Sequence, residues 1–421
     1  MEVLKLTLNL FIARMREEDK KVFARFGLAS WFSLCHVKLE DKLLNAVVHF
    51  WDSDLHVFRF NREEVCPLFE EFCALMNVSA RGPFVFPTLR RGYFHTLSSL
   101  FELSPMEAST FISENSIDLL KLASFFLREG GSSLALHRPT QYALALCIIG
   151  CFLVSNGTTS IPIETCELIL PLSESHNIIP LVLAETLNGL DYFHSNSASC
   201  IWGSPILLQM WLVERLKLIS PLDGPKHLSH DYCLRESVFF ERRSIQDVIV
   251  FLASLSWRDI QWHVAIWDCG DEYVLHTSGC CQVKLMGLTH TSFYWASRLL
   301  RQMGHVQSIL PIKGHVHGVE VATPSLVTWA MKKWASGLSM IQVGDFTRSF
   351  RLSDEYKVWL KQDLGVKVKA TKDRVRSLVY DPPVVDQSGG SSLPSDASRD
   401  RTAKGKKKNK DEAQARRARR A

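Results

Sequence analysis

The sequence lacks the short motifs that mark many catalytic and metal-binding proteins. No Cys-x-x-Cys pair occurs among its 11 cysteines, and neither Gly-x-x-x-x-Gly-Lys-Ser/Thr nor Gly-x-Gly-x-x-Gly is present. Structural zinc sites usually show paired ligands at such spacings, and phosphate-binding loops need those glycines. We therefore expect no metal centre and no bound cofactor.

Long apolar runs are also missing. The longest uncharged apolar stretch, residues 142–154, has 13 residues, whereas a helix needs about 20 to cross a bilayer. We expect a buried core helix there and no membrane partner. The N-terminus, MEVLKLTLNLF, has no small-residue cleavage pattern, so an ordinary helix or strand is favoured over a signal peptide.

The cysteines do not form a disulfide framework, because their number is odd and the chain of 421 residues is not a short secreted one. Cys147 and Cys151 lie one helical turn apart in an apolar run, where a thiol behaves as a small hydrophobe. This usage favours a reducing compartment, the cytosol or the nucleus.

The sequence gives only weak evidence for a catalytic or metal site, because each cluster of candidate residues also has an ordinary structural role. Loop histidines and buried thiols are commoner than zinc ligands, and acids beside Gly, Ser or Asn usually turn the chain or cap helices. We favour these structural roles, with a two-metal nuclease as the alternative. The candidates for metal binding are His227, His230, Cys233, His315, His317, Cys269, Cys280 and Cys281, and those for nuclease chemistry are Asp52, Asp54, Glu63, Asp268 and Asp271.

The apolar periodicity is mainly helical, with helical faces at residues 43–51, 117–127, 207–216, 245–252 and 326–334. Thr323 and Pro324 predict the start of the last of these helices. Short strands are expected at 56–60, 272–276 and 281–286. The predicted fold class is mainly α, a large helical domain with one or two small β-hairpins, followed by a disordered basic C-terminal tail.

The predicted divisions are a lead segment at 1–25, the helical domain at 26–380 and the tail at 381–421. Almost no large apolar residue follows Val385, so the tail cannot offset the entropy of ordering. Residues 399–421 carry a net charge of +8, although the whole chain carries only +5. Basic clusters of this kind suit a nuclear-import receptor or nucleic acid phosphates, and a merely solubilising tail is the alternative. The basic residues are Lys404, Lys406, Lys407, Lys408, Lys410, Arg416, Arg417, Arg419 and Arg420.

Residues 45–73, NAVVHFWDSDLHVFRFNREEVCPLFEEFC, predict helix, hairpin, helix. The first helix should close at Trp51, and residues 56–60 should alternate between two faces of a strand. Pro67 should start the second helix, with Glu70 and Glu71 near its positive end. The stretch is therefore interpreted as core structure, in which Glu70→Gln should cost little stability.

The order of the motifs resembles the plant mobile domain family, also described as aminotransferase-like and related to the maintenance-of-meristems proteins. The segments that carry the resemblance are LASWF at 28–32, LLNAVVHFW at 43–51, HVFRFNREEVCPLFEEFCALM at 56–76, SPILLQMWLVERL at 204–216, RLLRQMGHVQSILP at 298–311 and WAMKKW at 329–334. The individual anchors are Trp51, Phe58, Phe60, Glu64, Pro67, Leu68, Glu70, Gln209, Trp211, Glu214, Arg215, Arg301, Gln302, Gly304 and Gln307. Cys66 departs from the family pattern, which often has a capping residue such as Thr there.

The resemblance implies a non-enzymatic plant nuclear interaction protein that acts in meristem maintenance, genome stability or transposon silencing. It also implies protein partners, among them a protein phosphatase of the same pathway. The alternative is a transposable-element-derived protein with transposase-accessory or nuclease-related activity. The aminotransferase label finds no support in the residues, because no pyridoxal phosphate site can be assembled around Lys121, Lys217 or Lys284.

Overall fold

The structure is a computed structural model, and it describes residues 2–89, 92–129, 136–195, 197–198, 200–218, 242–348 and 350–362. The chain divides into two units, Met1–Asp381 and Pro382–Ala421. The description below concerns the first unit. The predicted basic tail clusters and the His227, His230 and Cys233 group lie outside the described residues.

Helices make up most of the described residues, which confirms the predicted fold class. The predicted faces at 43–51, 117–127, 207–216, 245–252 and 326–334 correspond to α4, α8, α12, α14 and α15. The α-helices are α1 (Glu2–Arg14), α2 (Glu17–Arg25), α3 (Trp31–Leu34), α4 (Asp41–Val47), α5 (Phe69–Met76), α6 (Tyr93–Phe101), α7 (Pro105–Phe111), α8 (Leu119–Glu129), α9 (Arg138–Ile148), α10 (Ile169–Ser173), α11 (Ile179–His194), α12 (Pro205–Arg215), α14 (Ile245–Ser254) and α15 (Pro324–Ser336). Short helical segments are η1 (Val48–Phe50), the π-helix η2 (Ile149–Leu153), η3 (Ile163–Leu168), η4 (Ala296–Arg298) and η5 (Leu300–Met303).

Two sequence signals set helix positions as expected. The Oγ1 of Thr323 accepts a hydrogen bond from the N–H of Leu326, so Thr323 caps α15 and Pro324 occupies its first turn. The apolar run at 142–154 forms the C-terminal part of α9 and then η2, and both are buried. Across the described ranges, no helix combines the length and the apolar character needed to span a bilayer.

Small antiparallel sheets lie between the helices. Their orders are β1-β2-β3, β4-β5-β6, β7-β10 and β8-β9, so the β content extends beyond the hairpins expected. The predicted strands at 56–60, 272–276 and 281–286 correspond to β2, β7 and β8. The strands are β1 (Trp51–Asp52), β2 (Val57–Phe60), β3 (Glu63–Val65), β4 (Ile112–Ser113), β5 (Ser116–Asp118), β6 (Ser160–Pro162), β7 (Glu272–Thr277), β8 (Val283–Met286), β9 (Thr291–Tyr294) and β10 (Leu338–Gln342).

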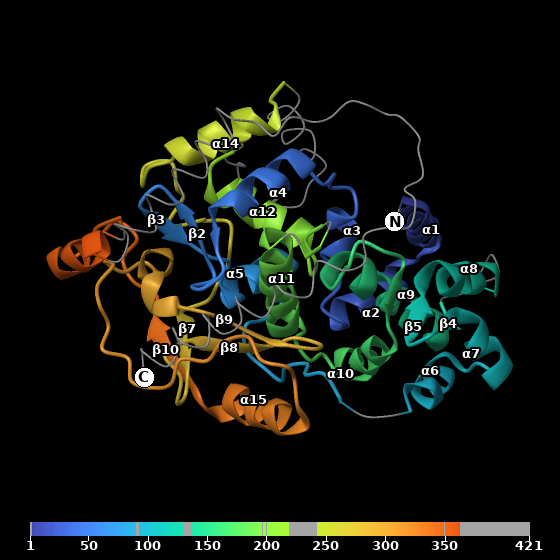
Figure 1. Ribbon diagram of the computed structural model, residues 1–421. Coiled ribbons are helices and arrows are strands. Elements are labelled where there is room, and N and C mark those ends of the chain that lie inside the picture. Colours follow the sequence, from blue (N-terminus) through green and yellow to red (C-terminus); the bar gives the residue numbers. More distant parts are fainter. Residues whose placement is uncertain are drawn as a thin grey trace, which may run out of the picture. The chain divides into compact units, whose positions relative to one another are not determined.

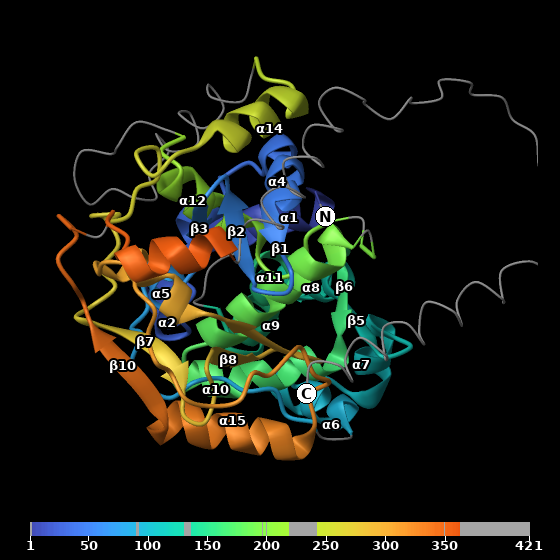
Figure 2. The same ribbon diagram turned by 60° about the vertical axis from the view of Figure 1, so that its left-hand side comes forward.

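Helix α11 lies in the interior, and most of its side chains are buried. It contacts α5, β8 and β9, whereas α4 packs with α14 and α15 packs on β8 (Figure 1; Figure 2). The packing on α11 is close: a Cβ added to Gly189 would lie 2.3 Å from the carbonyl oxygen of Trp202. Helix α1 contacts α8 and buries Leu4 and Leu8 in the same core.

Two local predictions for residues 45–73 agree with the structure and one was wrong. Helical structure continues from α4 through η1 to Phe50, and Trp51 follows as the C-cap and first residue of β1. Strand β2 presents its side chains to two faces, and both of these faces are buried. Helix α5 starts at Phe69 with Leu68 as its N-cap, so Pro67 precedes the helix and Cys66 takes no part in the cap.

Candidate functional site: a buried polar network and an acidic cleft

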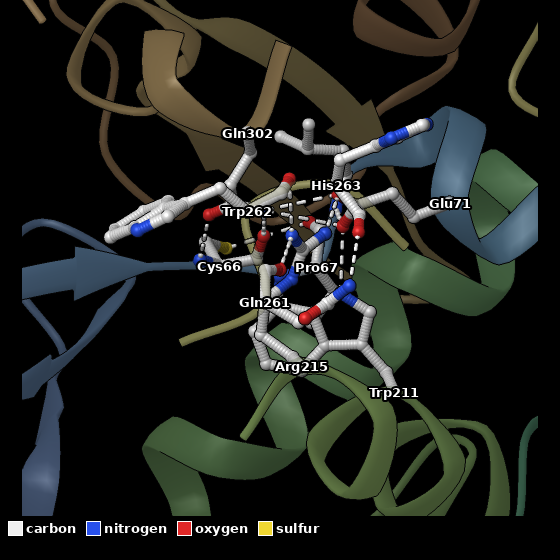
Figure 3. A network of polar contacts seen from close by, with 10 residues as sticks. Cys66, Pro67, Glu71, Trp211, Arg215, Gln261, Trp262, His263 and Gln302 are labelled. Atoms are coloured by element: carbon white, nitrogen blue, oxygen red, sulfur yellow. Dashed lines mark hydrogen bonds and ion pairs between the residues drawn. The ribbon is translucent and has the colours of Figure 1, made fainter. Parts of the chain in front are cut away.

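Glu71 occupies the centre of a buried polar network (Figure 3). It lies in the first turn of α5, and its Oε2 accepts hydrogen bonds from Trp211 Nε1 at 2.7 Å and from the N–H of Leu68 at 3.1 Å. Its Oε1 forms an ion pair with the Arg215 guanidinium. Glu71 and Arg215 are each 1% exposed. The pair therefore joins α5 to α12 inside the core.

Arg215 and Gln302 extend this network to other segments. The Nη1 of Arg215 donates to the carbonyl oxygens of Gln261 at 2.5 Å and Trp262 at 2.9 Å. The Nε2 of Gln302 donates to the carbonyl oxygen of Cys66 at 2.8 Å, and its Oε1 accepts from the N–H of Cys66 at 3.0 Å. Side chains from α12 and η5 thus hold two irregular segments by their main-chain atoms.

A second network surrounds Glu64 on β3, which accepts hydrogen bonds from Arg59 Nη2 at 2.8 Å and from Arg298 Nε at 2.9 Å. Burial alone would raise the pKa of Glu64, but the two guanidinium groups outweigh burial and hold that pKa below its ordinary value. Nη1 of Arg59 also contacts Oδ2 of Asp52 at 2.8 Å. These opposite charges neutralise one another between strands.

A third contact joins the buried His56 to Asp191, which is half-buried. The His56 Nε2 lies 2.8 Å from Asp191 Oδ2, and its Nδ1 lies 2.7 Å from the carbonyl oxygen of Phe293. The indole N–H of Trp51 donates to Asp191 Oδ1 at 2.7 Å. The imidazole also stacks on the Phe293 ring, with centroids 4.1 Å apart. This cluster ties the β1–β2 turn to α11 and β9.

The residues that carry the family resemblance come together in this interior. The Gln209 side chain accepts from the N–H of Glu40 at 2.6 Å and donates to the carbonyl oxygen of Lys38 at 2.8 Å. Gly304 has a left-handed φ of 83° and lies against Gly344. The buried anchors are Trp51, Phe58, Phe60, Glu64, Pro67, Leu68, Glu70, Gln209, Trp211, Arg215, Arg301, Gln302, Gly304 and Gln307.

The candidate metal-binding and nuclease residues that the structure describes take part in separate structural contacts. Within the described ranges, no group of three or more His, Cys, Asp or Glu side chains could hold a metal ion. Asp52 accepts from Arg59 and from the turn N–H groups of Asp54 and Leu55, while Glu63 Oε2 lies 2.5 Å from Arg301. Asp268 accepts from the N–H of Gly270, the turn role expected for such an acid.

The described cysteines are all free, and many of them are buried. Burial raises the pKa of the Cys147 thiol well above its ordinary value and that of Cys151 to about 12, as expected for thiols that act as small apolar groups.

The three lysines considered for a Schiff base lie far from one another in the fold. Lys121 contacts Asp118, Lys217 donates to the Arg258 carbonyl oxygen, and Lys284 is buried with its Nζ 2.7 Å from Glu320 Oε1.

A cleft of about 920 Å³ opens beside α5, between residues 77–81 and residues 266–272. Its walls carry Asp268, Asp271, Glu272 and Arg81, and Glu70 also lines it. The Oε1 of Glu70 accepts from the N–H of Val274 at 2.6 Å. Burial raises the pKa of Glu70 to about 8. The sequence contained the acids, but not the fold that places these distant segments together.

Residues 7–363 match the family described as Domain of unknown function (DUF7745). The chain belongs to this family. The match spans nearly all the described residues, including both networks and the cleft. No curated protein and no solved structure matches the chain.

Proposed function

We propose that this DUF7745 chain is a non-enzymatic nuclear interaction protein of plants, of the plant mobile domain type. Its field of action would be meristem maintenance, genome stability or transposon silencing, as the sequence resemblance implies. The observation that carries the non-enzymatic part is the role of the motif residues. Glu71, Arg215 and Gln302 join separate segments of the core, which is a structural use of polar groups rather than a reactive one.

Nuclear entry is proposed through the basic clusters at 404–410 and 416–420. Fusing residues 382–421 to a fluorescent cargo too large for passive diffusion should concentrate the cargo in plant nuclei, because paired basic clusters fit the acidic grooves of import receptors. The matched control replaces the nine lysines and arginines of these clusters by Gln. A cargo that remains evenly spread with the native tail would overturn this assignment.

Partner binding is tested by purifying the epitope-tagged chain from plant nuclei and measuring the mass and stoichiometry of its complexes. We expect a defined complex that survives high salt, and a protein phosphatase of the same pathway is the first partner to look for. A tagged nuclear protein of similar size and charge serves as the control. Recovery of the chain alone from every preparation would count against the interaction function.

The alternative, a transposable-element-derived protein with accessory or nuclease-related activity, makes a different prediction. Purified chain incubated with duplex or single-stranded DNA and Mg²⁺ or Mn²⁺ would then cleave it, and Asp52→Asn or Asp54→Asn would abolish cleavage. We expect no cleavage, because Asp52 is engaged by Arg59 and by the turn. Metal-dependent cleavage lost in either variant would overturn the non-enzymatic proposal.

A further inference from the structure

The acidic cleft is large enough to take several side chains of a ligand. Its volume of about 920 Å³ lies within the range of about 300–1,000 Å³ that is usual for ligand pockets. It is built from the end of α5, the 77–81 segment and the 266–272 loop, and Ser33 of α3 and Met340 of β10 also line it. Side chains far apart in sequence thus share one recess.

Negative charge dominates its lining. Asp268 and Asp271 are exposed, and Glu272, the first residue of β7, is half-buried. Among the described lining residues Arg81 is the one cation, and its Nη2 lies 3.3 Å from Glu272 Oε2. The two aspartates therefore remain as charge that this arginine does not offset. A phosphate-bearing ligand would be repelled, whereas a cation would be attracted.

Two buried polar atoms of the lining residues also lack partners. Glu70 is 1% exposed, and its Oε2 has no hydrogen-bond partner among the described residues. The indole Nε1 of Trp267 is likewise buried and unpartnered there. Buried polar groups nearly always have a hydrogen-bond partner, and leaving one unpaired is destabilising. Both residues line the recess, so a ligand there would complete the hydrogen bonding of the carboxyl group and the indole N–H.

We propose that this cleft binds a basic segment of a partner protein, with a Lys or Arg side chain reaching Glu70 between Asp268 and Asp271. A main-chain carbonyl of the same segment accepts from Trp267. A peptide supplies the cations and the carbonyl together, which a simple amine does not. This inference rests on the proposed interaction function and gives the chemistry of one partner.

The test uses full-length protein and a fluorescein-labelled peptide, (Gly-Arg-Gly-Lys)₃, with a counterpart that has Gln at each basic position. Fluorescence anisotropy measures Kd for the native chain, for Asp268→Asn/Asp271→Asn and for a control, Glu174→Gln/Asp354→Asn. The control removes the same charge from acids with 71% and 96% exposed side chains that do not line the cleft. We expect binding of the basic peptide only, weakened about tenfold in the cleft variant and within about twofold in the control.

Glu70→Gln provides a second variant, and its thermal midpoint is measured first to show that it folds. It should also weaken binding about tenfold, because a bound cation favours ionisation of the Glu70 carboxyl and pairs with it, whereas the amide cannot ionise. Equal weakening of peptide binding in the cleft variant and in the control variant would show that binding depends only on the overall charge of the protein. That result would overturn the site. Spermidine displacing the peptide at an equal concentration would overturn the peptide assignment.

The partner purification separates this inference from the proposed function. If Asp268→Asn/Asp271→Asn yields the same nuclear complex as the native chain and binds the peptide equally well, the cleft assignment fails and the interaction function stands. If no complex forms with either chain while the peptide still distinguishes the variants, the interaction function fails and the cation-binding cleft stands.

Discussion

Glu70 is a carboxyl group that folding moves from water into a low-dielectric interior. Burial raises its pKa from 4.5 to about 8, and Oε1 accepts from the N–H of Val274. The folded chain therefore keeps a proton that the unfolded chain releases above about pH 4.5. Its contribution to stability is complete below that pH and is lost as pH rises towards 8, at about 1.4 kcal/mol per pH unit.

Glu70→Gln should remove this pH dependence, because an amide does not titrate. Between pH 5.5 and 7.5 the free energy of unfolding of the variant should rise by about 2–3 kcal/mol relative to the native chain. Urea unfolding of both proteins at the two pH values measures the difference. The pKa of Glu185 is also raised, to about 7. Because Glu185 is present in both proteins, its contribution cancels in the difference. Parallel stability curves would contradict the protonated state of Glu70.

Phe58 tests the structural interpretation of residues 45–73. Its side chain is 0% exposed and its ring lies 4.8 Å from that of Trp51, centroid to centroid. Phe58→Ala should lower the free energy of unfolding by about 3–5 kcal/mol, because it leaves a cavity in a packed core. Phe94→Ala, at a side chain 38% exposed, is the control and should cost far less. Similar losses in both variants would disprove the difference in burial.

At the scale of elements, the ion pair between Glu71 and Arg215 fixes α5 against α12. Glu71→Gln and Arg215→Met should each cost about 3–5 kcal/mol, since each leaves one buried group without its partner. The double variant should cost clearly less than the two losses together, because no uncompensated charge remains. Denaturant unfolding of all four proteins gives this coupling, and purely additive losses would show that the pair is not energetically linked.

The sequence predicted helices and strands well where neighbouring residues alone determine them. The apolar periodicity of α12 and α14, and the Thr323–Pro324 start of α15, depend on neighbours in sequence. The start of α5 was misplaced by two residues, because Leu68 rather than Pro67 caps the helix and its N–H donates to Glu71. Burial of both faces of β2 depends on elements that its own alternation does not reveal.

At the scale of the whole molecule, the family match ends at residue 363 and the first compact unit ends at Asp381. Removing residues 382–421 should leave the thermal midpoint of unfolding within about 1 °C, since the composition of that segment gives it little apolar surface to bury. Differential scanning calorimetry of the full and shortened chains measures it. A fall of several degrees would show that the segment stabilises the body.

The sequence by itself determined the fold class, the positions of α4, α8, α9, α12, α14 and α15, three of the strands and the concentration of basic charge in the last 23 residues, because composition and short-range periodicity carry that information. Only the tertiary structure decided what the buried acids do. Glu71 and Arg215 are 144 positions apart, and nothing local in either segment specifies the other as its partner. The same holds for the cleft, where Glu70 lies with Asp268 and Asp271 because folding brings α5 against β7. Pairing across such distances depends on which apolar faces pack together, and that is settled by the whole chain.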